Sequence, residues 1–301
     1  IVVLSQKNRQ PDQNPGAKLT LEMDLSSDIL AHFDGALRSF LFVRQNWKTL
    51  YKALAFACVP LVLLGSFFFM GFFRETMSSA MRGSQAVPSF GGMLLGYLFY
   101  GLGFLLFVSI IQEYLRAYLT QEHTTLTSGE LIKRAVAQVP MYFGLGFVSY
   151  LIIILCMLAF ILPGIWMAIA LSLVFTCHGI ERTGFGSISR SFNLVKGDWW
   201  NTFGTLFLQG LLVGVIAYAV MIPFFLLMGF GAFSSASSGT DPEAAGTMMM
   251  NVMPIMMAVM SVVYLFLYPL PIIGCALIYF SQVEKKEQRG LGDQISQFDK
   301  L

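Results

Sequence analysis

The chain alternates between long apolar runs and short polar segments, and this pattern is the first guide to its fold. Apolar runs occupy about residues 50–73, 91–115, 202–233 and 248–280, and residues 135–180 contain no Asp, Glu, Lys or Arg. About 20 apolar residues in a helix cross the hydrocarbon core of a bilayer, so the last stretch is long enough for two crossings. Its middle carries Leu162-Pro163-Gly164, which predicts a tight turn.

The runs therefore predict an all-α integral membrane protein with six transmembrane helices. Backbone polar groups in lipid must be paired within the chain, which favours helices over irregular segments. We place the six spans at about residues 50–73, 91–115, 140–161, 164–180, 202–233 and 248–280.

The distribution of Lys and Arg predicts the orientation of these spans. If the N-terminus is cytoplasmic, all of the 19 Lys and Arg residues except Arg74 and Arg82 face the cytoplasm. Cytoplasmic loops of membrane proteins carry such an excess, so both termini are expected inside, in the bacterial cytoplasmic (inner) membrane. We expect a flexible cytoplasmic N-terminal segment at 1–27, the membrane domain at 28–280 and a charged cytoplasmic tail at 281–301.

Composition agrees with a membrane solvent and narrows the partners. The chain is 56% hydrophobic and 12% charged, whereas soluble domains have about 25% charged residues. A net charge of +2 is too small to indicate nucleic acid. The expected partners are membrane lipids and a membrane protein or a second copy of this chain.

Two polar segments that precede spans resemble each other and indicate an internal repeat. The segment before the first span begins Arg38-Ser39-Phe40 and ends at Trp47, and the segment before the fifth begins Arg190-Ser191-Phe192 and ends at Trp199. The second copy places its apolar residues at spacings of three and four, which predicts an amphipathic helix. A third, weaker copy starts at 127–130, where Thr127 is a candidate helix cap. The chain then reads as three units, each an interfacial amphipathic helix followed by a transmembrane hairpin.

These segments hold the candidate site residues, and two interpretations stay open. They can form a docking surface for a partner or for anionic lipid headgroups, or they can anchor and pack the repeats. Anchoring is favoured because basic amphipathic helices are common at membrane interfaces. The candidates are Arg38, Ser39, Phe40, Trp47, Arg190, Ser191, Phe192, Lys196 and Trp199.

The repeat also carries a family resemblance. Glu181, Arg190-Ser191-Phe192, 194–197, Trp199-Trp200 and the charged exit at 279–287 resemble the bacterial six-span family called the glycerophosphoryl diester phosphodiesterase membrane domain, with related uncharacterised membrane proteins. The likeness covers about residues 30–295. In that family the membrane region can be fused to a soluble phosphodiesterase with metal-binding carboxylates and catalytic histidines. These 301 residues contain no such domain, so the resemblance implies no hydrolase activity.

A search for reactive groups gives no catalytic constellation, and no cofactor or metal is expected. No ionisable residue falls in the middle of a predicted span, where such residues mark ion and proton pathways. One weak alternative is a metal site built from acidic and histidine residues near the cytoplasmic face: Glu113, Glu122, His123, His178 and Glu181. The polar residues inside spans, Gln209 and Asn251, are expected to form hydrogen bonds between helices.

Glycine spacing predicts close packing at two places. Gly92 with Gly96 and Gly210 with Gly214 have the small-xxx-small spacing that lets transmembrane helices approach. Without a reactive centre, the sequence favours a non-catalytic subunit or scaffold of a membrane complex. The alternative is transport or handling of a lipid or other hydrophobic substrate without ion coupling.

Overall fold

The structure is a computed structural model that describes residues 15–81, 90–122 and 125–237, and residues 252–298 apart from 254–255, 258 and 262. Throughout these ranges the regular elements are helices. They are α1 (Pro15–Met81), α2 (Phe90–Leu119), α3 (Ser128–Ala159), α4 (Ile161–Ala170), α5 (Val174–Glu181), α6 (Gly186–Val195), α7 (Trp199–Ser237) and α9 (Pro269–Phe298).

Six helices are long and apolar enough to cross a membrane, as the sequence predicts. They cover Trp47–Ser79, Phe90–Leu119, Ser128–Ala159, Ile161–Glu181, Trp199–Leu227 and Val259–Lys286. The expected all-α fold class and the number of candidate spans are confirmed. The bounds differ from the predicted ones: the third candidate span begins 12 residues earlier than expected, at Ser128, and the sixth begins 11 residues later, at Val259.

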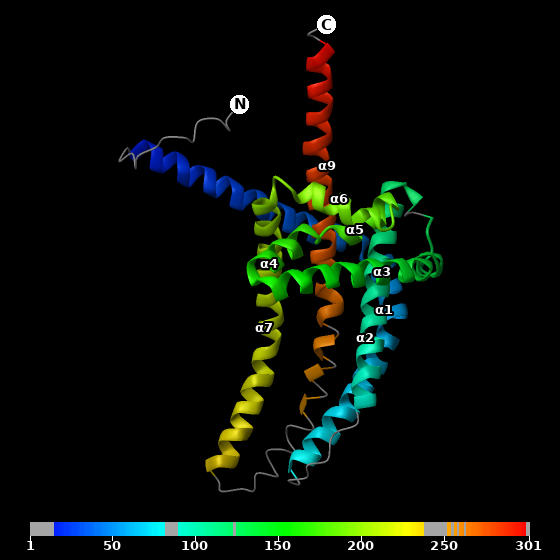
Figure 1. Ribbon diagram of the computed structural model, residues 1–301. Coiled ribbons are helices and arrows are strands. Elements are labelled where there is room, and N and C mark those ends of the chain that lie inside the picture. The colour runs from blue at the N-terminus through cyan, green and yellow to red at the C-terminus, as the bar shows by residue number, and fades with distance from the viewer. Residues whose placement is uncertain are drawn as a thin grey trace.

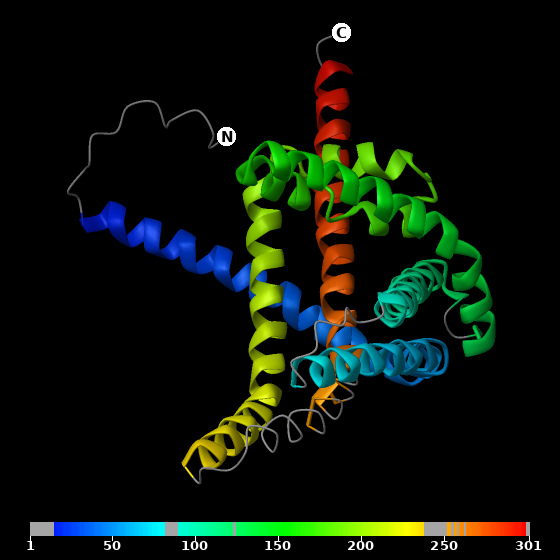
Figure 2. The ribbon, with the colours of Figure 1, turned by 60° about the horizontal axis from the view of Figure 1, so that its bottom comes forward.

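The long helices α1, α2, α7 and α9 meet near one end of the molecule, where the other helices lie (Figure 1). The later part of α1 lies beside α2, while α7 and α9 extend in roughly the same direction (Figure 1). Helix α3 runs crosswise to α7 and α9 in both views, close to α4, α5 and α6 (Figures 1 and 2). We call α3–α6 the end layer. The start of α1 and the end of α9 also lie on this side of the molecule.

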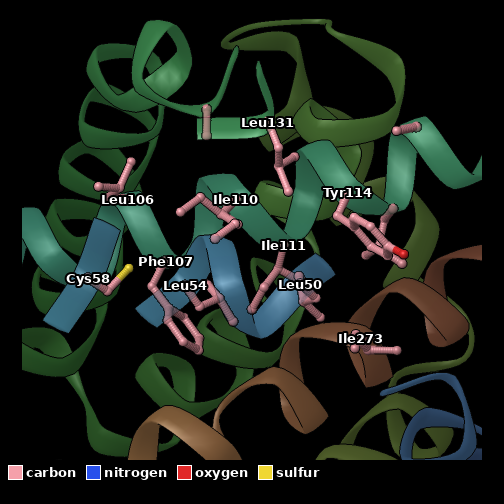
Figure 3. Close-up of a cluster of buried hydrophobic side chains, with 14 of the residues drawn as sticks. Leu50, Leu54, Cys58, Leu106, Phe107, Ile110, Ile111, Tyr114, Leu131 and Ile273 are labelled. Carbon is pink, nitrogen blue, oxygen red and sulfur yellow. The ribbon is translucent and has the colours of Figure 1, made fainter. Parts of the chain in front are cut away.

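The main apolar core lies where the α1–α2 hairpin meets the end layer and α9. Leu54 and Ile110 are completely buried between α1 and α2, Leu131 joins them from α3 and Ile273 from α9 (Figure 3). Association of helices in lipid depends on such van der Waals packing rather than on the hydrophobic effect. Four segments that are distant in sequence are therefore fixed at one place.

The two glycine pairs behave differently. A Cβ added at Gly96 would lie 2.5 Å from the Phe69 ring, and one at Gly92 would lie 3.4 Å from the Phe68 carbonyl. The predicted close approach is therefore confirmed for this pair. At Gly210 and Gly214 an added Cβ would meet no described atom within 4 Å, so no described helix packs closely against this pair.

The turn between the third and fourth spans lies two residues earlier than predicted. Helix α3 ends at Ala159, Phe160 is extended with φ −161° and ψ 145°, and α4 begins at Ile161. Pro163 therefore sits in the first turn of α4, where its missing N–H costs little because the first N–H groups of a helix have no partner inside it.

Of the three predicted interfacial helices, only α6 is a separate element. The first predicted copy lies within α1, which is continuous from Pro15 to Met81, and the third is the first part of α3. Thr127 does cap α3, because its Oγ1 accepts a hydrogen bond from the Glu130 amide at 3.3 Å. The threefold repeat stays a prediction, as do the boundaries at 27 and 281, where the helices α1 and α9 run on without a break.

Candidate functional site

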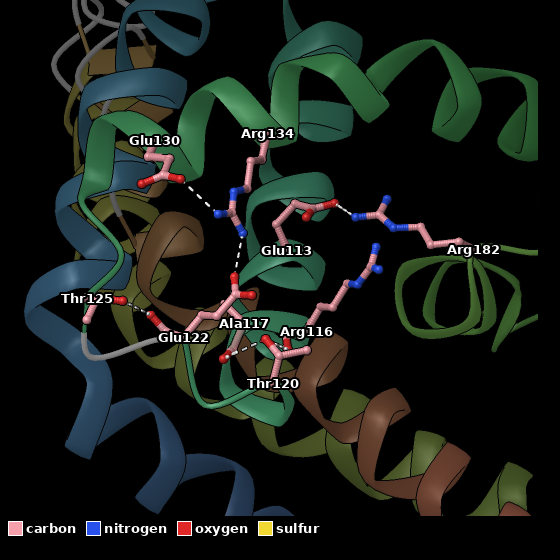
Figure 4. Close-up of polar contacts among 9 residues, drawn as sticks. All are labelled: Glu113, Arg116, Ala117, Thr120, Glu122, Thr125, Glu130, Arg134 and Arg182. Carbon is pink, nitrogen blue, oxygen red and sulfur yellow. Dashed lines mark hydrogen bonds and ion pairs between the residues drawn. The ribbon is translucent and has the colours of Figure 1, made fainter.

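Polar side chains gather where the end of α2 meets α3 and the end of α5. They line a cleft of about 350 Å³, which we call the polar cleft (Figure 4). Its lining residues are Glu113, Arg116, Ala117, Thr120, Glu122, Arg134, Ala137, Gln138 and Arg182.

An ion pair between Glu113 and Arg182 forms the floor of the polar cleft. The two side chains are only 6% and 22% exposed. Arg182 ends α5 in the left-handed conformation, with φ 57°, and its amide donates to the His178 carbonyl at 2.9 Å. This conformation is uncommon for residues other than glycine. From this position the Arg182 side chain extends from the end of α5 to Glu113 on α2 (Figure 4).

The mouth of the polar cleft is more exposed. Arg134 donates to Glu122 and to Glu130, at 2.8 Å in each case, and these side chains are 43–51% exposed. Solvent screens such pairs, so each contributes about 0–1 kcal/mol to stability. The ionic contacts of the cleft thus change from a buried floor to a solvated mouth.

Hydrogen bonds beside the floor connect α2 to α3 and α5. Gln112 donates to the Thr176 hydroxyl at 3.1 Å, and the Ser109 hydroxyl donates to the Ala135 carbonyl at 2.8 Å. His178 Nε2 lies 3.3 Å from Gln138 Oε1. Buried polar groups that are bonded in this way specify one arrangement of the helices, because alternatives would leave them unpaired.

A second polar cluster ties α6 and the start of α7 to α9. Glu181 accepts from Arg190 Nε at 2.8 Å and from the Tyr279 hydroxyl at 2.6 Å. Asp198 accepts from Gln282 at 2.7 Å and from Lys285 at 3.0 Å. Burial alone would raise the pKa of Asp198, but the hydrogen bonds from Lys285 and Gln282 outweigh it and hold that pKa below its ordinary value.

The candidate residues of α6 and α7 have partners inside the chain. Ser191 is fully buried and donates to the Ala170 carbonyl at 2.8 Å, and Arg190 pairs with Glu181. Phe192 packs edge-on against Trp166, whose carbonyl accepts from the Trp199 indole at 3.1 Å. These contacts favour anchoring over docking for this copy.

The other candidate residues are exposed or have side chains outside the described part of the structure. Lys196 is exposed and its carbonyl accepts from Lys286 at 2.9 Å. Trp47 is 54% exposed on α1. Arg38, Ser39 and Phe40 belong to α1, but their side chains lie outside the described residues.

The alternative of a metal site receives no geometric support. Within the described ranges, no group of three or more His, Cys, Asp or Glu side chains could hold a metal ion. His178 and Glu181 share a helix, yet one faces Gln138 and the other Arg190 and Tyr279. His123 lies outside the described residues.

The polar residues predicted inside spans also need revision. Gln209 is buried against Gly274 of α9, and among the described atoms neither end of its amide has a hydrogen-bond partner. Gln209 therefore does not form the expected hydrogen bond to another helix within the described residues. Asn251 lies outside the described residues.

A second cavity, of about 280 Å³, is apolar and lies between α1, α2 and residues 261–268. We call it the apolar pocket; it is lined by Cys58, Val62, Tyr100, Gly103, Phe104, Phe107, Ser261, Tyr264, Leu265 and Tyr268. Phe107 lines this pocket and Arg116 lines the polar cleft. These two positions are nine residues apart in sequence, which is about two and a half turns of α2, so the two cavities lie on opposite faces of that helix.

Sequence reasoning missed the polar cleft. Glu113, Arg116 and Arg182 each flank an apolar run, which is a signal that they lie near the same end of their spans. Which glutamate meets which arginine depends on how α3 crosses α2 and α5, and no local pattern encodes that crossing.

Together, the six candidate spans and the polar clusters at their ends define a multi-pass membrane protein. Comparison with protein-family models, with curated proteins and with solved structures found no match in any of the three. The family resemblance of residues 30–295 therefore stays a prediction, and no function is taken from it.

Proposed function

We propose that this protein is a non-catalytic module that acts as a subunit or scaffold of a membrane complex and associates with its partner through α7. The bacterial inner membrane is the expected location, with both termini in the cytoplasm. The partner is a membrane protein or a second copy of this chain.

The observation that carries the proposal is the uncovered length of α7. Only 6% of its most apolar stretch is buried inside the chain, whereas the figure for α2 is 44%. Val215 is 61% exposed, Tyr218 72% and Leu226 67%. Lipid can cover such a surface, but a helix of a partner gains the close packing that stabilises helix pairs in membranes.

Two glycines give α7 a surface that a helix can approach closely. Gly210 and Gly214 are one turn apart, and a Cβ at either would meet no described atom within 4 Å. Small residues at this spacing let two backbones come near each other and gain van der Waals contact. This open surface supports a partner helix more than it supports lipid alone.

The attachment of α7 at its N-terminal end also supports the proposal. Asp198 and Trp199 hold the start of α7 to α9 and α4 through hydrogen bonds. A span that is fixed at one end and uncovered along its length can present a defined face to a partner. Such a role requires no reactive group.

Site-specific photo-crosslinking tests this proposal. A photoreactive amino acid is placed at Val215 of α7 and, as the matched control, at Leu63 of α1, which are 61% and 58% exposed. We expect a protein adduct from Val215 and only lipid adducts from Leu63. Only lipid adducts from both positions, with a monomer in mild detergent, would contradict the proposal.

A substitution at the α7 glycines gives a second test. Gly214→Ile should abolish recovery of the partner on mild-detergent purification, because the added side chain keeps a second helix away. Gly101→Ile on α2 is the matched control, since Gly101 also has no described atom within 4 Å of an added Cβ. Equal recovery of the partner with both variants would show that the partner does not bind at the α7 glycines.

Handling of a hydrophobic molecule is a second candidate function, and the apolar pocket is the observation in its favour. Three tyrosines, Tyr100, Tyr264 and Tyr268, line it together with aliphatic groups. Gly103→Leu should fill the pocket, since a Cβ at Gly103 makes only ordinary contacts, the nearest at 3.5 Å to Leu61. Native mass spectrometry would then show loss of a bound lipid. Unchanged lipid occupancy would count against this function.

Orientation can be measured independently of either function. The charge bias predicts that Arg74 faces away from the cytoplasm. A cysteine placed at Arg74 should react with an impermeant maleimide in intact cells, whereas one placed at Lys285 should react only after lysis. The reverse pattern would show that the orientation is inverted.

A further inference from the structure

Three arginines from separate parts of the fold line the polar cleft. Arg116 comes from α2, Arg134 from α3 and Arg182 from the end of α5. Figure 4 shows their side chains extending toward the region around Glu113. A guanidinium is planar and carries five N–H donors, which suits the oxygens of a phosphate group.

Several of these donors have no acceptor. The Nη2 group of Arg182 bonds Glu113, but its Nε and Nη1 atoms are buried and, within the described residues, have no hydrogen-bond partner. Arg116 also lines the cleft, and its guanidinium makes no hydrogen bond or ion pair with another described residue (Figure 4). Buried donors without acceptors cost free energy, so a ligand with several oxygens would be favoured at this place.

The charges of the lining define the ligand further. At the mouth, Arg134 pairs with both Glu122 and Glu130, so it contributes no free positive charge. At the floor, Arg116 and Arg182 oppose the single carboxylate of Glu113, which leaves one positive charge there (2 − 1 = 1). This excess disfavours a metal cation. It matches one negative charge, as on the phosphate diester of a phospholipid or on singly charged inorganic phosphate.

We propose that the polar cleft is a binding site for a single phosphate group, supplied by a phospholipid headgroup or by free phosphate. The group enters past Arg134, which is 43% exposed, and reaches the donors of Arg116 and Arg182 near the buried Glu113. The cleft volume of about 350 Å³ leaves room for the substituent of a headgroup. The site is separate from the α7 surface and does not depend on a partner protein.

Two binding measurements on the full chain in phosphate-free detergent buffer test the site and distinguish the sources. One adds inorganic phosphate against matched chloride and follows the temperature of thermal unfolding. The other adds phosphatidylglycerol, or diacylglycerol as the lipid without phosphate, and counts bound lipids by native mass spectrometry. Saturable binding of phosphatidylglycerol but not diacylglycerol assigns a headgroup, and saturable stabilisation by inorganic phosphate assigns the free ion. The site is wrong if neither probe binds.

Substitutions locate the binding in the cleft. Arg116→Gln should weaken binding of whichever probe binds by about tenfold or more, because it removes one charged donor group. Arg74→Gln, at an exposed position in α1, is the matched control and should bind as the wild type does. Arg116→Lys keeps the charge but not the paired donors, so intermediate binding is expected. Wild-type affinity in an Arg116→Gln variant with an unchanged unfolding temperature would overturn the proposal.

Discussion

Two regions of the molecule differ in how their side chains are covered: the end that carries the polar clusters, which we call the polar end, and the outer part of α7. At the polar end, α2, α3, α5, α6 and α9 are joined by ion pairs and hydrogen bonds between buried or half-buried groups. Along α7 the side chains are mostly uncovered and apolar. The polar end therefore fixes how the helices are arranged, while the apolar surface of α7 is available to lipid or to a partner.

The largest effect should come from breaking the floor of the polar cleft. Glu113→Leu leaves Arg182 without its carboxylate in a site where it is 22% exposed. Removing one partner of a buried ion pair costs about 3 kcal/mol, because the remaining charge is unpaired. Unfolding in detergent can be followed with a thiol-reactive dye, since Cys58 and Cys177 are buried free thiols. A loss below about 1 kcal/mol would mean that this end does not hold the fold.

A smaller effect separates tight packing at the polar end from open space on α7. A Cβ at Gly179 would lie 2.8 Å from Gln112 and 3.0 Å from the Tyr142 hydroxyl. Gly179→Ala should therefore cost about 1–3 kcal/mol through overpacking. Gly210→Ala should instead stabilise α7 by up to about 1 kcal/mol, because alanine favours helix over glycine. Similar shifts in unfolding temperature for both variants would show that Gly179 is not more tightly packed than Gly210.

The mouth of the polar cleft should contribute less than its floor. Arg134→Ala removes two ion pairs, with Glu122 and Glu130, whose side chains are about half exposed. The expected loss is below about 1 kcal/mol, and added salt should reduce it further. A loss as large as that of Glu113→Leu, measured by the same dye assay, would show that exposure does not decide the energy of these pairs.

The smallest effect concerns pH and the link between α7 and α9. Because the folded pKa of Asp198 is lowered, its carboxylate stabilises the fold at pH values above its unfolded pKa of about 3.9, and this contribution is lost as the pH falls through the folded value. Asp198→Asn should therefore lower the unfolding temperature modestly at pH 7. The difference from the wild type should vanish in strongly acidic buffer. A difference that grows toward acid would reverse the sign of this linkage.

The apolar pattern was sufficient to predict the number and approximate position of the six candidate spans. A run of apolar residues has a length, and that length can be compared with the bilayer. The pattern could not place α3 across the other helices, because crossing angles depend on side-chain contacts between distant segments. It also misplaced the turn at Phe160, since Pro163 is tolerated in the first turn of a helix.

The candidate site shows the same limit more clearly. The sequence singled out Arg190, Ser191 and Trp199 by their repetition, and the structure gives these three side chains partners within the chain. The three arginines of the polar cleft are not repeated and are far apart in sequence. A repeat indicates a shared local structure, whereas a cleft depends on tertiary packing.

A double-mutant cycle at Glu113 and Arg182 tests most directly whether this pair holds the polar end together. Glu113→Leu, Arg182→Leu and the double variant are compared with the wild type by thermal unfolding in the same detergent. If the pair is coupled, the double variant loses much less stability than the sum of the two single variants, because neither charge is left unpaired. Losses that add within about 0.5 kcal/mol would show that Glu113 and Arg182 do not hold the polar end together as a pair.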